Sequence, residues 1–346
     1  MNARVDRLRE KLEEPLLVSD PANVRYLTGL ASSNAAVLVE PDRVRLFTDF
    51  RYAERARAVE GAETVETKRD LYQSLAELLS GTIGFEATSL TYERHARLHA
   101  GGLELVPRYG LVEELRAVKD EDEVETIRRA AAIAMTAFER FVDEGDVIGR
   151  TERELAWRME RFMREASADG MSFPVHVATG PNAAKPHSTP GDRRVQPGET
   201  VLIDAGCMVD GYCSDGTRTF ATGPLPDELR RAYEVCLEAQ LAGLEAVRPG
   251  ASGPGVDSAA RDRIEAAGFG EHFGHGLGHG VGLLVHEDPR LAQDSRSTLG
   301  VGNVVTVEPG IYLPGLGGIR IEDLVVVRDD GPEILTTFTK DLIALD

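Results

Sequence analysis

Acidic side chains that interrupt apolar, strand-like segments are the first feature of this chain that could support chemistry. Asp204 directly follows the apolar run Val-Leu-Ile, and Asp215 lies a short way beyond it in "VLIDAGCMVDGYCSDGTRTF". A carboxylate that points into a core needs a cation or hydrogen-bond donors. Both aspartates are therefore candidate metal ligands, with solvated turn or edge positions as the alternative for each.

Backbone geometry brings these two aspartates together. Asp210-Gly211 is a strong signal for a two-residue hairpin turn between apolar strands. With that turn, Asp204 lies opposite Thr217, and Asp215 points to the same face of the hairpin as Thr217. The two carboxylates are then diagonal neighbours, about 7–8 Å apart at the backbone, and can converge on one or two cations.

Two glutamates repeat this pattern further along the chain. Glu308 closes "NVVTVE", and Glu322 lies in "GIRIEDLVVV". The connecting "LPGLGG" is too irregular to fix the register, so the pattern leaves open whether the two glutamates share a face. A buried ligand and an edge-strand charge are both compatible with it.

A glycine-rich stretch, "FGHGLGHGVGLLVHEDPR" (residues 273–290), contains three of the eight histidines. It has neither the glycine spacing of a dinucleotide-binding loop nor the Gly-Lys-Ser/Thr end of a phosphate-binding loop. The chain also lacks the HEXXH motif of zinc proteases and the G-x-S-x-G motif of serine hydrolases. One imidazole among four carboxylates is a ligand set that suits Mn²⁺, Co²⁺ or Zn²⁺, with room for a hydroxide shared by two ions.

The elements that must position these side chains divide into two parts. Residues 1 to about 118 are predicted to form a small α/β domain, in which strand-like segments precede helices near residues 51–59 and 71–79. The charged "AVKDEDEVE" then opens a long amphipathic helix that ends at Gly145. We place the domain boundary just before this helix.

Residues 119–346 show one order of elements twice. A capping box at Thr151–Glu154 starts a second helix, which precedes the strands with the aspartates. Two more helices, over residues 227–247 and 256–267, precede the strands with the glutamates. This order predicts a pseudo-symmetric α/β (α+β) domain with a site between its halves.

Composition and charge exclude several other functions. The 346 residues carry a net charge of −19, from 39 basic and 58 acidic residues, which argues against a nucleic-acid or anionic-membrane partner. No uncharged apolar run approaches the roughly 18 residues of a membrane span, and the charged N-terminal stretch does not resemble a secretory signal. The three cysteines form no CxxC pair, so we expect a reduced, cytoplasmic protein.

In order and spacing, these motifs resemble those of the pita-bread metallopeptidases of family M24, specifically the Xaa-Pro peptidases (aminopeptidase P and prolidase). The resemblance rests on "SFPVHVATGPNAAKPHS", "VLIDAGCMVDGYCSDGTRTF", "GHGLGHGVGLLVHEDPR", "VEPGIY" and "GIRIED". More loosely, "NVRYLTGL", "NAAVLV" and "LFTDFRY" are similar to the family's creatinase/prolidase-like N-terminal domain. The resemblance implies such a domain over residues 1–118, a pita-bread catalytic domain over residues 119–346, and a homodimer.

The resemblance also assigns roles to individual residues. It implies two divalent metal ions, Mn²⁺ with Co²⁺ or Zn²⁺ as alternatives, and their ligands would be Asp204, Asp215, His279, Glu308 and Glu322. Catalytic roles fall to His187, His275, His286, Glu308 and Arg320. Substrate binding falls to His187, His286, Tyr312, Arg320 and Arg290.

The reaction that the resemblance implies is hydrolysis of an Xaa-Pro bond at a peptide N-terminus by a metal-bridging hydroxide. The partner is then a peptide with proline at its second position. The histidines would stabilise the tetrahedral oxyanion, and Glu308 would transfer the proton.

Several alternatives stay open beside this expected Xaa-Pro aminopeptidase. An Xaa-Pro dipeptidase (prolidase) is the first, because Arg290, or an N-terminal-domain arginine from a partner subunit, could bind a free proline carboxylate. A methionine aminopeptidase shares the ligand pattern but normally lacks the N-terminal domain. A non-peptidase hydrolase or lyase, or a catalytically inactive binding module, could use the same fold.

Overall fold

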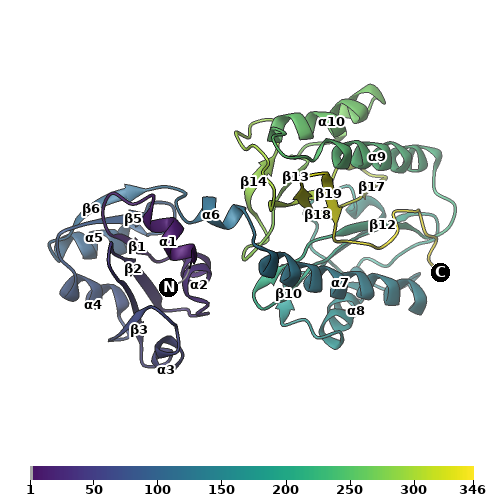
Figure 1. Cartoon of the computed structure of the whole chain (residues 1–346). Coiled ribbons are helices and arrows are strands. Elements are labelled where there is room, and N and C mark those ends of the chain that lie inside the picture. Colours follow the sequence, from purple (N-terminus) through teal and green to yellow (C-terminus); the bar gives the residue numbers. More distant parts are fainter. Residues whose placement is uncertain (1–2) are drawn as a thin grey trace. The chain divides into compact units, whose positions relative to one another are not determined.

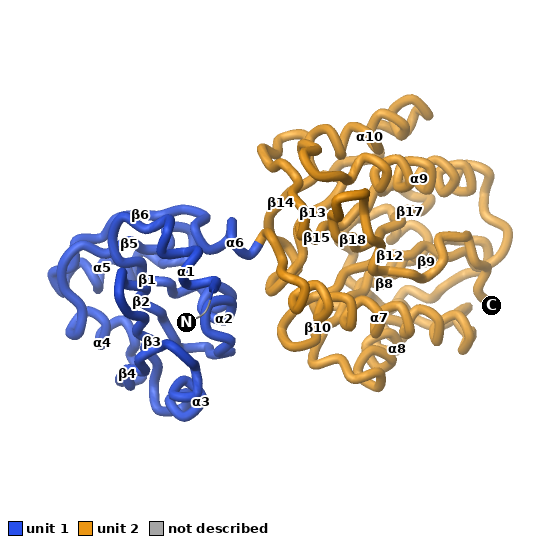
Figure 2. Tube along the Cα trace, in the orientation of Figure 1, with its two compact units in different colours: residues 1–116 blue, residues 117–346 orange. Residues whose placement is uncertain are grey.

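The computed structural model describes residues 3–346, and the chain divides between Arg116 and Ala117 into two compact units (Figures 1 and 2). The division lies close to the boundary expected near residue 118. Each unit has a hydrophobic core of its own.

The N-terminal unit is built on a six-stranded mixed sheet with the strand order β4-β3-β2-β1-β5-β6. Its strands are β1 (Leu16–Val18), β2 (Ala35–Val39), β3 (Val44–Asp49), β4 (Glu63–Thr67), β5 (Thr82–Glu86) and β6 (Glu104–Arg108). Its helices are α1 (Ala3–Arg9), α2 (Pro21–Thr28), α3 (Ala53–Arg57), α4 (Leu71–Leu78), α5 (Tyr92–Ala100) and α6 (Glu113–Ala117), the last of which reaches the division. Leu75 of α4 and Leu98 of α5 pack in one core with Phe47 of the sheet.

The second unit contains helices α7 (Glu121–Glu144), α8 (Glu152–Glu165), α9 (Asp227–Ala246) and α10 (Gly253–Ala266). Its strands are β7 (Gly170–Met171), β8 (His176–Thr179), β9 (Thr200–Asp204), β10 (Cys207–Val209), β11 (Tyr212–Cys213), β12 (Thr217–Ala221), β13 (Gly278–Gly280), β14 (Glu287–Leu291), β15 (Val304–Val307), β16 (Gly310–Leu313), β17 (Gly317–Arg320), β18 (Asp323–Arg328) and β19 (Gly331–Ile334). Short 3₁₀ turns lie at Gly180–Asn182 and Gly270–His272.

The order of two helices followed by strands occurs twice in this unit, as predicted. Figure 1 shows α7 and α8 on one side of the strands and α9 and α10 on the other. The first pair packs on β8, β9 and β12 through Phe138, Phe162 and Phe220. The second pair packs on β15 and β18 through residues such as Ile264 and Val325. The strands of both halves therefore lie between two helical layers.

Local signals explain where the helices begin. Asp120 and Thr151 cap α7 and α8, each in a capping box with the glutamate three residues later. Helix α10 begins at Gly253, earlier than predicted, because the Ser252 side chain accepts a hydrogen bond from the backbone N–H of Gly255. Among the described residues, no helix combines the length and apolarity needed to cross a bilayer.

Candidate metal centre

The hairpin that carries the two aspartates has the predicted register. Asp210 and Gly211 occupy its turn with φ values of 48° and 75°, as a two-residue turn of this kind requires. Asp204 pairs with Thr217 across β9 and β12. Asp204 and Asp215 both line one cavity of about 340 Å³, so the diagonal arrangement derived from the turn brings them to a common site.

The two glutamates face each other across a second pair of strands. Val307, at the end of β15, pairs with Asp323, at the start of β18, and Gly310, at the start of β16, pairs with Arg320, at the end of β17. Both ladders have the same register, so Glu308 and Glu322 lie opposite each other where one ladder gives way to the next. This geometry answers the question that the sequence left open.

His279 reaches the same cavity from β13, which lies between β14 and β15 in the second-half sheet. A Cβ atom on the neighbouring Gly278 would lie 2.0 Å from the carbonyl oxygen of Thr306, so a glycine is needed for the strands to approach. The Nδ1 atom of His279 lies 3.0 Å from the carbonyl oxygen of Gly280. Its Nε2 atom is therefore left to face the acids, 3.3 Å from Glu308 and 3.7 Å from Asp215.

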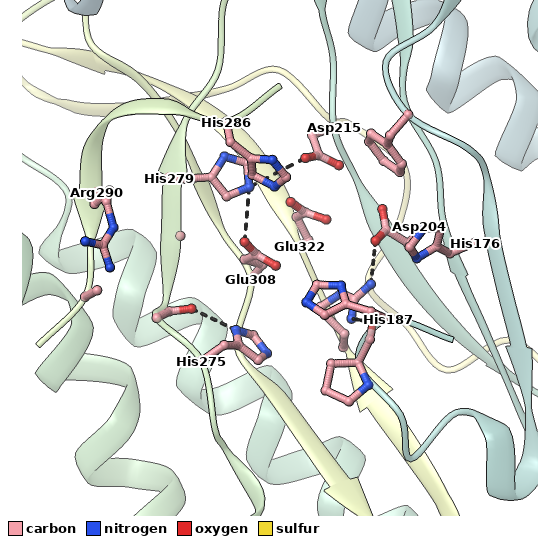
Figure 3. A pocket seen from close by; sticks show the side chains of 16 residues that line it. His176, His187, Asp204, Asp215, His275, His279, His286, Arg290, Glu308 and Glu322 are labelled. Atoms are coloured by element: carbon pink, nitrogen blue, oxygen red, sulfur yellow. Dashed lines mark hydrogen bonds and ion pairs between the residues drawn. The ribbon is translucent and has the colours of Figure 1, made fainter. Parts of the chain in front are cut away.

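Asp215, His279 and Glu322 form a tight cluster of potential ligands. One ligand atom from each lies within 4.8 Å of the other two, and Figure 3 shows Glu308 beside them. Groups this close can reach a single divalent ion at bond lengths of about 2.0–2.2 Å. In addition, Asp204 Oδ1 is buried and has no hydrogen-bond partner among the described residues.

The electrostatics of the cluster show a deficit of positive charge. Burial, reinforced by repulsion from Glu322, Asp204 and Glu308, raises the pKa of Asp215 well above its ordinary value. Burial and the charges of Glu308 and Asp204 raise the pKa of Glu322 in the same way. Carboxylates in this condition are stabilised by protons or by cations, so the donor set fits divalent metal ions.

His279 and Glu308 behave as an ion pair in the protein without a cation. Burial opposes a charge on each, but their mutual contact outweighs it. The pKa of His279 is raised to about 9, and that of Glu308 is lowered to about 2. A metal ion that binds His279 must therefore displace its proton.

Arg320 and Tyr312 join the acids to a neighbouring histidine. The Arg320 guanidinium donates to Asp204 Oδ2 at 2.5 Å and to the Tyr312 hydroxyl at 3.0 Å. The same hydroxyl lies 2.9 Å from His275 Nε2. Arg320 and His275 line the cavity, whereas Tyr312 supports both from behind.

The remaining residues expected at the site lie at the more exposed part of the cavity. His187, His286 and Arg290 all line it and are solvent-exposed. The rings of His286 and His279 meet edge to face with their centroids 4.3 Å apart. Arg290 forms an exposed ion pair with Asp294 at 3.0 Å. The structure thus brings all ten expected site residues other than Tyr312 into one cavity (Figure 3).

The similarity of the whole chain to known proteins agrees with this arrangement. A model of metallopeptidase family M24 matches residues 125–329, and a model of the Creatinase/Prolidase N-terminal domain matches residues 4–118. The chain belongs to metallopeptidase family M24. It is thus a hydrolase of the metallopeptidase type, and its family implies divalent metal ions at the cluster described above.

Relatives of this M24 peptidase match over almost their whole length. The uncharacterized peptidase YqhT of Bacillus subtilis is 39% identical over 337 residues, 95% of each chain. The structure of an Xaa-Pro dipeptidase from Bacillus anthracis has a TM-score of 0.96 at 37% identity, over 99% of each chain. That of an X-Pro aminopeptidase from Thermotoga maritima has a TM-score of 0.90 at 34% identity, over 98% of this chain and 100% of its own.

Sequence analysis of the M24 site missed His176 and Phe173. Both line the cavity, and their rings meet edge to face with centroids 5.9 Å apart. His176 stands opposite Asp204 in the pairing of β8 with β9, and burial lowers its pKa. A long loop joins β8 to β9, so no local turn could fix the register that brings His176 to Asp204.

Proposed function

We propose that this M24 peptidase hydrolyses Xaa-Pro dipeptides, with an Xaa-Pro aminopeptidase activity as the second candidate. The observation that carries the proposal is the presence of Arg290 in the cavity that contains the Asp215–His279–Glu322 cluster. A free proline carboxylate needs a cation close to the reacting centre, and a guanidinium can bind a carboxylate through two hydrogen bonds.

The metal component of the proposal is a pair of divalent ions, with Mn²⁺ as the proposed metal and Co²⁺ or Zn²⁺ as alternatives. Their ligands would be Asp204, Asp215, His279, Glu308 and Glu322. When bound, such ions polarise a carbonyl and supply a nucleophilic hydroxide at neutral pH. The unpartnered Asp204 Oδ1 and the raised pKa values of Asp215 and Glu322 support this assignment.

The protein's own residues would bind and orient the peptide. The nitrogen of an Xaa-Pro bond carries no hydrogen, so recognition depends on the carbonyl, the ring and the two chain ends. His286 would donate to the developing oxyanion, and burial lowers its pKa. The ring nitrogens of His275 instead lie 2.8 Å from the Gly276 carbonyl oxygen and 2.9 Å from the Tyr312 hydroxyl. Arg320 holds Asp204 in place, and Glu308 would accept a proton during attack and return it to the departing proline nitrogen.

The choice between the two activities turns on the proline carboxylate. The sequence favoured an aminopeptidase, and the T. maritima relative is named as one. Arg290 instead favours a dipeptidase, and so does the likeness to the B. anthracis enzyme. Peptides that continue beyond proline have no carboxylate at this place, so a dipeptidase gains affinity from Arg290 that an aminopeptidase cannot use.

A direct test compares Leu-Pro, Leu-Pro-amide and Leu-Pro-Gly with the Mn²⁺-loaded protein. We expect kcat/KM to be highest for Leu-Pro. Arg290→Gln should lower it by about tenfold to a hundredfold, through KM, because a charge-assisted hydrogen-bonded pair contributes about 1.5–3 kcal/mol. The same change should scarcely affect Leu-Pro-amide, and Arg296→Gln, an exposed arginine on the same segment, is the control. Faster cleavage of Leu-Pro-Gly than of Leu-Pro would establish the aminopeptidase instead.

The homodimer and the cytoplasmic location expected from the sequence stay predictions. Sedimentation of the purified protein tests the first, and fractionation of cells tests the second.

A further inference from the structure

Glu152 is a buried carboxylate outside the metal centre, and its surroundings are unusual for an acid. It is the first residue of α8 and is 0% exposed. Its charge is favourably placed, because a helix N-terminus attracts negative charge. The hydrogen bonds to its two oxygens nevertheless all come from residues outside its own helix, at one loop of the second unit.

This carboxylate joins the two ends of the loop over residues 180–191. At the first end, Glu152 Oε1 accepts from the backbone N–H of Thr179 at 2.9 Å and from the Asn182 amide at 3.0 Å. At the other end, Oε2 accepts from the backbone N–H of Gly191 at 3.1 Å. The Thr179 hydroxyl and a second contact from Asn182 complete a set of five bonds from uncharged donors.

The loop that Glu152 closes carries part of the substrate cavity. Pro186 and His187 line that cavity, and the Pro186 carbonyl accepts a hydrogen bond from Arg320 at 3.4 Å. His187 itself is exposed. The position of its imidazole therefore depends on how the ends of the loop are held.

We propose that Glu152 is a positioning residue that holds the loop over residues 180–191 closed and thereby presents His187 to the substrate. The inference rests on the proposed function to the extent that His187 acts on an Xaa-Pro peptide. A carboxylate suits this task because both of its oxygens accept, so a single side chain satisfies donors from both ends of the loop.

The test is a double-mutant cycle between Glu152→Gln and His187→Ala. The glutamine amide would place its N–H₂ against donors of Thr179, Asn182 or Gly191, so at least one end of the loop is released. We expect Glu152→Gln alone to lower kcat/KM for Leu-Pro by about tenfold to a hundredfold. In the His187→Ala background the same change should cost less than about twofold, because the residue through which Glu152 acts is gone.

Two further variants separate positioning from general stability. Glu154→Gln is the matched control, since Glu154 lies in the same helical turn but, among the described residues, its side chain bonds only to Thr151 of the helix cap. It should lower the melting temperature without changing kcat/KM. Asn182→Ala removes two of the five bonds and should give a smaller loss than Glu152→Gln, which keeps the test usable if the latter folds poorly.

Hydrogen exchange and metal titration complete the experiment. Glu152→Gln should speed exchange at the Thr179 and Gly191 amides and leave Mn²⁺ affinity unchanged, because the proposed ligands lie on other elements. An unchanged kcat/KM, or an equal loss with and without His187, would overturn the proposal. If the unmutated protein cleaves no Xaa-Pro peptide, the proposed function fails, and exchange at the two amides alone decides whether Glu152 holds the loop.

Discussion

At the scale of residues, the candidate metal centre is a set of buried acids that outnumber the basic side chains beside them. Arg320 donates hydrogen bonds to Asp204 and to the Tyr312 hydroxyl, and His279 forms an ion pair with Glu308. Burial and repulsion from the neighbouring carboxylates raise the pKa values of Asp215 and Glu322, so these two acids are left to hold protons. The site is therefore prepared to exchange protons for metal ions.

This exchange predicts that metal affinity depends on pH. Without metal, the pKa of His279 is about 9, and Asp215 and Glu322 hold protons above the ordinary range of carboxylic acids. Each proton released on binding makes the apparent affinity rise about tenfold per pH unit. Calorimetric titration with Mn²⁺ between about pH 6 and 8, in buffers of different ionisation enthalpy, should show net proton release. An affinity independent of pH would contradict this account of the acids.

The excess of buried carboxylates over positive charges also predicts that Asp215→Asn stabilises the metal-free protein. The pKa of Asp215 is raised on folding, so the folded protein binds this proton more tightly than the unfolded chain. Its contribution to stability is present below pH 3.8 and is lost as pH rises towards the folded pKa. Asparagine avoids that loss, so Asp215→Asn should have the larger free energy of unfolding at pH 7. Urea unfolding of both proteins in the presence of a chelator measures the difference in their free energies of unfolding. In saturating Mn²⁺, the unmutated protein should instead be the more stable of the two.

At the scale of elements, strand register decides which side chains meet. The Asp210-Gly211 turn fixes how Asp204 lies relative to Thr217, so this half of the site follows from the sequence. No comparable turn adjoins Glu308 and Glu322. Their alignment depends on two consecutive ladders with one register, which only packing of the whole second half establishes.

Contacts between distant segments account for what the sequence could not predict. His176 meets Asp204 through strands joined by a long loop, and Glu152 meets that loop from the start of α8. Neither pairing leaves a local pattern of turns or periodicity. Helices with capping boxes and amphipathic faces, by contrast, were predicted to within a few residues, because their signals are local.

Close packing of β13 on β15 predicts that alanine substitutions at two glycines of the glycine-rich stretch (residues 273–290) differ sharply in their effect on stability. Gly278→Ala would bring a methyl group to 2.0 Å from the Thr306 carbonyl oxygen, so the strand that carries His279 must move. We expect a loss of about 2–3 kcal/mol in unfolding free energy together with weaker Mn²⁺ binding. Gly274→Ala is the control, since a Cβ there meets nothing within 4 Å. Equal effects of the two changes would refute a packing role for Gly278.

At the scale of the whole molecule, each unit contains its own core, but among residues 3–346 only the second unit contains the metal cluster. Leu75 and Phe47 belong to the N-terminal core, whereas Asp215, His279 and Glu322 all lie in residues 117–346. A ligand stabilises the state that binds it. The effect of metal should therefore be confined to one part of the chain.

Hydrogen exchange with and without Mn²⁺ tests this expectation. At a metal concentration of about 100 times Kd, the binding unit should gain about 2.7 kcal/mol. Amides of β9, β12, β15 and β18 should then exchange more slowly, and those of β1 to β6 should be unaffected. Equal protection of both units would show that metal binding couples them.

Reconstitution of peptidase activity is the most direct test of the central claim, that Asp215, His279 and Glu322 anchor the metal ions of an Xaa-Pro peptidase. Release of proline from Leu-Pro should disappear when the protein is treated with a chelator and return on addition of Mn²⁺. Glu322→Gln should abolish this recovery, although the variant remains folded. Full activity in chelator, or a folded Mn²⁺-loaded protein that cleaves neither Leu-Pro nor Leu-Pro-Gly, would contradict the account.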